Sequence, residues 1–270
     1  FDIPISLSLD DAGSEFTDKR LAVLAVNYPV LGDHFATLSL EQIKTLRKIN
    51  PNIIILRYMS AAAGYQVIDN KFKLAHPEIF LKNPDGSLPR GLLSPDDELV
   101  IDPANAFWRE TLANAARTAV TEEGYDGIMM DQLVMVNRLY NGFNGVNPAT
   151  GNAYTTEEWR DAMYDLLAEV KQAMGPNALL VGNSIRDGPG YYAEGAGRFL
   201  AVLDGVVAEG YKGPLSRDTL FYPKESEWIK NVDVLVDVQS QGKYFLAIAK
   251  YDKNRVTSQE DLSQHVMFTL

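Results

Sequence analysis

The chain has 270 residues, 46% of them hydrophobic and 23% charged, which suits one large α/β barrel or two smaller domains. A formal net charge of −11 argues against nucleic acid as a partner, because an acidic surface repels phosphate backbones. The absence of cysteine excludes disulfides, thiolate metal sites and a cysteine nucleophile, and no apolar run approaches the roughly 20 residues that insert across a membrane.

Strands and helices are expected to alternate along the chain. Apolar runs predict strands, the first of them a short edge strand, over residues 4–9, 21–28, 53–59, 99–102, 125–131, 179–184, 205–209 and 244–251. Amphipathic stretches with capping residues predict helices over residues 39–49, 107–120, 156–174, 192–200, 228–239 and 258–270.

This alternation has no break in composition, so we predict a single catalytic domain over residues 1–270 with the (β/α)₈ TIM-barrel fold of the α/β class. Seven main strands leave the eighth unassigned. The barrel closes either beyond residue 270 or through residues 4–9. A doubly wound open sheet is the rival architecture, but residues 27–32 carry no glycine-rich dinucleotide fingerprint. Two long segments, 61–97 and 136–154, are expected to cover a site.

Polar and aromatic residues recur where the predicted strands end. In a barrel such residues meet at one mouth. Carboxylates, amides, cations and aromatic faces together are the chemistry of a carbohydrate site. The candidates are Asn27, Tyr28, Arg57, Tyr58, Asp102, Asp131, Gln132, Asn183, Glu209 and Lys250, with Tyr211 as a further stacking residue.

Asp131 and Glu209 are the candidate catalytic pair. Each directly follows a short apolar strand that begins with Asp-Gly, at residues 126–127 and 204–205. Two carboxylates in different environments can serve as the ionised and the protonated partner of a glycosidase. The alternative for Asp131 is an N-cap or a salt bridge to Arg57 or Lys250, and the alternative for Asp102 is a cap for the following helix. Asp126 is interpreted as a turn residue.

Other chemistries find little support. The three histidines, His34, His76 and His265, lack metal-ligand spacing, so neither a metal nor an organic cofactor is expected. No Gly-x-Ser-x-Gly elbow is present. Lys250 lies between Ala249 and Tyr251 and could form a Schiff base in an aldolase or isomerase, a third hypothesis behind hydrolysis and glycan binding without cleavage.

Three motifs carry a resemblance to a known family: HPEIFLKNPDG at residues 76–86, IDPAN at 101–105 and YDGIMMD at 125–131. The chain resembles (β/α)₈ glycoside hydrolases, similar to endo-α-1,4-polygalactosaminidases and more distantly to the α-galactosidase and α-glucosidase clan. The resemblance implies a nucleophile after the fourth strand and an acid/base after the sixth, the places of Asp131 and Glu209.

The expected function is therefore a retaining glycoside hydrolase that cleaves an α-linked polysaccharide or oligosaccharide. Carboxyl groups about 5–5.5 Å apart would fit retention, and roughly 6.5–9.5 Å would fit inversion. The resemblance alone favours a secreted or cell-surface location. The sequence leaves the sugar, the mode of attack and the oligomeric state open.

Overall fold

A computed structural model of the chain describes residues 6–9, 16–33, 38–64, 70–88, 99–133, 145–185, 191–192, 195–208 and 224–247. Two compact units make up the chain, one of residues 4–180 and one of residues 181–270 with 1–3. The expectation of a single catalytic domain remains a prediction.

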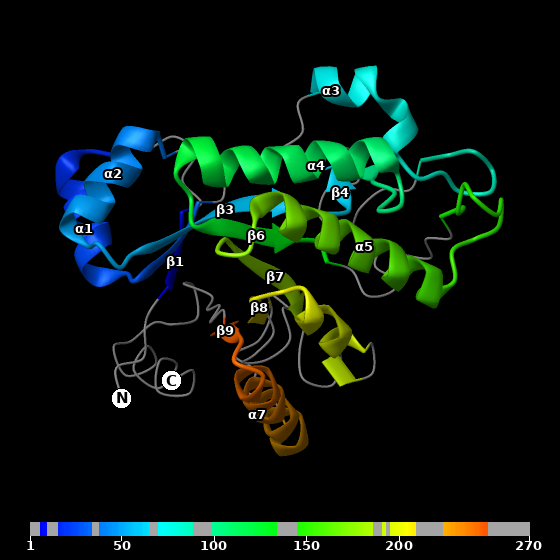
Figure 1. Cartoon of the computed structure of the whole chain (residues 1–270). Coiled ribbons are helices and arrows are strands. Elements are labelled where there is room, and N and C mark those ends of the chain that lie inside the picture. Colours follow the sequence, from blue (N-terminus) through cyan, green and yellow to red (C-terminus); the bar gives the residue numbers. More distant parts are fainter. Residues whose placement is uncertain are drawn as a thin grey trace, which may run out of the picture. The chain divides into compact units, whose positions relative to one another are not determined.

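The first unit is built on parallel strands that pair in chain order (Figure 1). They are β1 (Ser6–Leu9), β2 (Val30–Asp33), β3 (Ile54–Ser60) and β6 (Gly127–Asp131). Ile55 and Ile128 are fully buried, as expected for parallel strands covered on both faces. Ser60 pairs with Asp131, so β3 and β6 end together.

The helices of this unit pack in pairs, α1 beside α2 and α4 beside α5 (Figure 1). They are α1 (Asp18–Asn27), α2 (Leu40–Ile49), α4 (Ala106–Thr118) and α5 (Thr156–Met174). Ser39 and Thr155 form capping boxes at the starts of α2 and α5, which confirms both predicted helices. A π-helical turn, η2 (Ala119–Glu123), extends α4 as far as Gly124.

The predicted strand over residues 21–28 is wrong, because this segment forms α1. Thr17 caps the helix, and Leu21, Leu24 and Ala25 are buried at helical spacing, while Val26 is 74% exposed. The strand of this region is β2, which begins directly after Pro29.

The segment 99–102 is likewise not a strand of the main sheet. Only Leu99–Val100 form a strand, β5, and it pairs antiparallel with β4 (Ala63–Gly64) in a separate small sheet. The connection between β4 and β5 includes α3 (Asn70–Ala75) and a 3₁₀ turn, η1 (Pro77–Ile79). The parallel strands in chain order are β1, β2, β3 and β6, so β6 is still the fourth parallel strand along the chain.

The second unit continues the same alternation. β7 (Leu179–Ile185) begins in the first unit, and β8 (Gly205–Ala208) and β9 (Tyr244–Ala247) follow it as parallel strands. A 3₁₀ helix, η3 (Ala196–Ala201), and α7 (Glu225–Ser240) fall on predicted helices. The end of the predicted strand 244–251 and the predicted helix 258–270 lie outside the described residues.

Candidate active site

Asp131 is the last residue of β6, where the strand leaves the core. Its carboxylate accepts hydrogen bonds from a side chain and from the backbone. The Tyr58 hydroxyl donates to Oδ2 at 2.6 Å, and the Gln132 backbone N–H donates to Oδ1 at 2.7 Å. Tyr58 is itself only 4% exposed, so its ring is fixed by packing. The carboxylate therefore has a defined orientation at the strand end.

Gln132 adopts a left-handed backbone conformation with φ of +57°. A non-glycine residue rarely takes this conformation, which carries a cost of order 1–3 kcal/mol and is concentrated at functional sites. Here the turn directs the Gln132 N–H at the preceding carboxylate. The predicted site residue Gln132 thus acts on Asp131 through its backbone.

The end of β3 supports Asp131 from the neighbouring strand. The Ala61 N–H donates to the Asp131 carbonyl oxygen at 3.0 Å, and the Trp108 indole N–H donates to the Ala61 carbonyl oxygen at 2.8 Å. Trp108 is buried on α4. A helix therefore anchors the segment that holds the backbone of Asp131.

Two predicted binding residues do not lie at the strand end that holds Asp131. Asn27 is the last residue of α1 and donates to the Val23 carbonyl oxygen, and Tyr28 caps that helix just before β2 begins. The sheet edge at which strands begin is opposite the edge that holds Asp131, so placing both residues at the mouth was wrong.

Arg57 also differs from the prediction, because it lies in the middle of β3. Its guanidinium pairs with the Glu123 carboxylate of η2. Side chains alternate along a strand, so Arg57 points to the face opposite Tyr58. Of these two neighbours, Tyr58 is the one that contacts Asp131.

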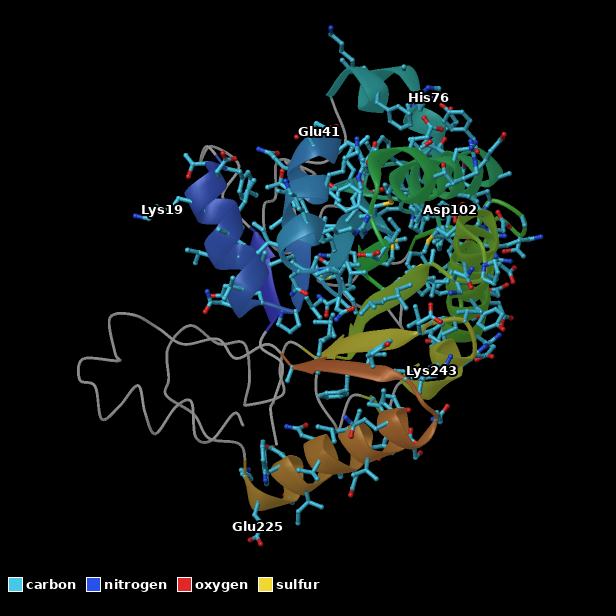
Figure 2. All side chains as sticks on the ribbon, turned by 60° about the vertical axis from the view of Figure 1, so that its left-hand side comes forward. Lys19, Glu41, His76, Asp102, Glu225 and Lys243 are labelled. Atoms are coloured by element: carbon cyan, nitrogen blue, oxygen red, sulfur yellow. The ribbon has the colours of Figure 1, made fainter. Side chains whose placement is uncertain are left out.

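Asp102 is buried and hydrogen-bonded. Its Oδ1 accepts from the Tyr154 hydroxyl at 2.8 Å and from the Ala104 N–H at 2.9 Å, and Asn105 is the N-cap of α4. Burial raises the pKa of the Asp102 carboxyl, although these donors act in the opposite direction. Figure 2 shows Asp102 within the layer of α4 and α5, whereas His76 lies near α3 at the edge.

The other predicted residues belong to the second unit. Asn183 lies two residues before the end of β7, in a stretch where the pairing with β8 shifts register. Glu209 follows Ala208, the last residue of β8, and it lies outside the described residues with Tyr211 and Lys250. Their roles stay predictions.

One buried carboxylate was missed. Asp33 ends β2, is fully buried, and its Oδ2 accepts from the Leu38 N–H at 2.9 Å and the Tyr125 hydroxyl at 2.7 Å. The hydrogen bond and the charge of Asp33 add to burial in raising the pKa of Tyr125. The signal was the short run Val30-Leu31-Gly32-Asp33, an acid after a strand, which the misassigned run 21–28 concealed.

A family model matches residues 47–270 and is described as hypothetical glycosyl hydrolase family 15. The chain belongs to this hypothetical glycosyl hydrolase family. The predicted resemblance to glycoside hydrolases is thereby confirmed, and carbohydrate is the substrate class of this family. No match was found among curated protein sequences.

Solved structures show the fold. The glycoside hydrolase domain of PelA from Pseudomonas aeruginosa aligns with a TM-score of 0.63 at 17% identity, over 92% of this chain and 86% of that one. Ega3 from Aspergillus fumigatus, in complex with galactosamine, aligns with 0.54 at 13% identity, over 95% and 80%. A cycloisomaltooligosaccharide glucanotransferase from Paenibacillus sp. aligns with 0.64 at 14% identity, over 93% and 39%. The predicted α/β fold of TIM-barrel type is confirmed.

Two further observations concern the part of the chain that the structure describes. None of its helices combines the length and hydropathy that a membrane crossing requires. Within the same residues, no three His, Cys, Asp or Glu side chains gather so as to hold a metal ion.

Proposed function

We propose that the chain is a retaining glycoside hydrolase of α-linked polysaccharides, with Asp131 as the nucleophile and Glu209 as the general acid/base. The observation that carries this proposal is the Asp131 carboxylate, held by Tyr58 and by the strained Gln132 at the end of the fourth parallel strand. A carboxylate with a fixed orientation suits attack on an anomeric carbon.

The reaction then has two steps. An Asp131 carboxylate oxygen forms a bond to the anomeric carbon while the bond to the leaving oxygen breaks, and Glu209 gives that oxygen a proton. Glu209 next takes a proton from water, which attacks the same carbon and releases Asp131. Both inversions occur at one carbon, so the product keeps the starting configuration.

A polymer that contains α-1,4-linked galactosamine is the first substrate to test. It follows from the sequence resemblance to polygalactosaminidases, and a structure of Ega3 is a complex with galactosamine. The net charge of −11 also favours a polymer with free amines over an anionic one.

The decisive variants are Asp131→Asn and Glu209→Gln, assayed by release of reducing ends from such a polymer. Asp131→Asn should lower kcat by about 10⁴-fold or more, as removal of a nucleophile does. Glu209→Gln should lower it by about 10²–10⁴-fold on the polymer and much less on an aryl glycoside, whose leaving group needs no proton.

Asp165→Asn is the matched control, since Asp165 is exposed on α5 and should leave kcat unchanged. The first product should have retained configuration by NMR. Inverted product would reject the role of Asp131 as nucleophile. Tight glycan binding without any release of reducing ends would instead favour a non-catalytic module, and trapping of a carbonyl substrate on Lys250 by borohydride would favour Schiff-base chemistry.

A further inference from the structure

A groove of about 490 Å³ lies in the first unit, between the loop of residues 82–86 and the loop of residues 146–153. This volume falls within the range of small-molecule sites. Lys82, Asn83 and Asn152 supply polar groups, and the remaining walls are formed by glycine, proline, alanine and valine residues. Figure 1 shows both loops at the right, on the side toward which β3 and β6 point.

Both walls of the groove are held by their own hydrogen bonds. In one loop the Asn83 N–H donates to the Ser87 carbonyl oxygen at 2.8 Å, and in the other the Asn147 N–H donates to the Asn152 carbonyl oxygen at 2.7 Å. The Val146 N–H donates to the Lys82 carbonyl oxygen at 2.9 Å and joins the two loops. The groove is thus preformed and needs little ordering when a ligand binds.

A continuous set of backbone hydrogen bonds connects this groove with Asp131. Each bond joins one extended segment to the next, from the end of β6 through the β3–β4 segment, β5 and the residues after η1. The bonds are Ala61 N–H to Asp131 at 3.0 Å, Ile101 N–H to Ala62 at 2.9 Å, Leu81 N–H to Val100 at 3.0 Å and Val146 N–H to Lys82 at 2.9 Å. Four steps of roughly 4.8 Å between segments and three of about 3.8 Å along the chain place this edge of the groove at most about 30 Å from Asp131.

We propose that the groove is a distal subsite for the same glycan, where it binds an uncharged hexose or N-acetylhexosamine residue several units from the cleaved bond. The inference rests on the proposed function, because it assumes that the glycan also reaches Asp131. The Lys82 ammonium can donate to hydroxyl or acetyl oxygens and repels a free amine, so in a polymer that carries free amines this subsite takes an uncharged or N-acetylated residue. A chain that occupies both places must be long, so the enzyme prefers polymers and cleaves within them.

The test uses the full chain carrying Asp131→Asn, which should bind without turnover, and N-acetylated α-1,4-galactosamine oligomers of two and eight sugars. Adding Lys82→Ala should raise the Kd of the octamer about tenfold, which is the usual effect of losing a charged hydrogen bond. The Kd of the dimer should change less than twofold. Ala153→Trp should fill the groove and act in the same direction, while Lys44→Ala, at an exposed lysine on α2, is the matched control.

Changes in the backbone amide shifts of the non-proline residues in 82–86 and 146–153 on adding the octamer would locate the binding. An octamer that binds equally well to Lys82→Ala, Ala153→Trp and the control would overturn the subsite, as would failure of the octamer to bind at all. If the octamer binds in the groove but the chain without these substitutions releases reducing ends neither from the octamer nor from the galactosamine polymer, the subsite stands and the proposed hydrolysis fails.

Discussion

At the scale of single residues, the orientation of Asp131 depends on Tyr58, which donates to its carboxylate, and on Trp108, which anchors the segment bound to its backbone. Tyr58 could be predicted, since it lies near the end of the strand beside β6 and shares a face with Ser60, the residue paired with Asp131. The part played by Trp108 could not, because it depends on how α4 packs against the segment after β3. The sequence places Trp108 only on the predicted helix over residues 107–120.

Trp108→Phe should therefore reduce catalysis by the proposed nucleophile more than substrate binding. The variant keeps an aromatic ring in the core but loses the indole N–H that donates to Ala61 at 2.8 Å. Freed from this bond, the Ala61 segment holds the Asp131 backbone less firmly. We expect kcat for polymer cleavage to fall about tenfold, with KM changed less than twofold.

The matched control is Trp159→Phe, the same substitution at a fully buried tryptophan of α5. It should lower the free energy of unfolding but leave kcat unchanged. Equal losses of kcat in both variants would show that Trp108 matters only for stability.

At the scale of elements, the two Asp-Gly strand starts have one structural explanation. The Asp126 carbonyl oxygen accepts from Leu179 N–H at 2.9 Å, and the Asp204 carbonyl oxygen accepts from Tyr244 N–H at 2.9 Å. In both places the glycine that follows lies against the first residue of the next strand. Asp126 also bonds Arg47 and the Ile55 N–H, which agrees with its predicted turn role. The repeated Asp-Gly sequence therefore allows two neighbouring strands to begin side by side.

Gly127→Ala should consequently be strongly destabilising. A Cβ at this position would lie 1.9 Å from the Leu179 carbonyl oxygen, a backbone atom that cannot move without disturbing the strand pairing. We expect the free energy of unfolding in urea to fall by about 3 kcal/mol. Gly151→Ala is the control. Its φ is +71° but nothing lies within 4 Å of the added Cβ, so about 1 kcal/mol is expected. Similar losses in the two variants would refute the steric explanation.

Elements with capping residues were predicted well, and the errors fell on short apolar runs. The Ser39 and Thr155 boxes fix the starts of α2 and α5. Residues 21–28 are apolar at almost every position, so their helical period is concealed until packing shows that Val26 is exposed. Residues 99–102 form too short a run to reveal that their partner is β4 rather than the main sheet.

At the scale of the whole molecule, the fold class follows from the alternation of elements, which survives two misassigned strands. The composition of the site follows less directly. Residues at strand ends can be placed together only when every strand is assigned correctly. The predicted positions of Asn27, Tyr28 and Arg57 were wrong because of errors in strand assignment or in side-chain direction. Both segments that form the groove were expected to cover a site, but the groove itself could not be predicted, because it depends on how two loops separated by about 60 residues lie together.

The stability of the whole chain should depend on pH through Asp102. Burial raises its pKa, so the unfolded state releases this proton first as pH rises. The contribution of Asp102 is full below about pH 4 and declines as pH rises through the pKa of the folded state. Asp102→Asn removes the charge, and an amide oxygen can still accept from Tyr154 and Ala104. The free energy of unfolding of Asp102→Asn, relative to that of the wild type, should therefore rise between pH 4 and pH 7.

Urea unfolding at several pH values would check this expectation. Asp102→Ala leaves two buried donors unsatisfied and should lose about 1–3 kcal/mol at every pH. Asp85→Asn is the control of opposite sign. Hydrogen bonds from Ser87 lower the pKa of Asp85, so its contribution is present at neutral pH and is lost in acid. A constant difference between Asp102→Asn and the wild type would mean that Asp102 does not titrate differently in the folded chain.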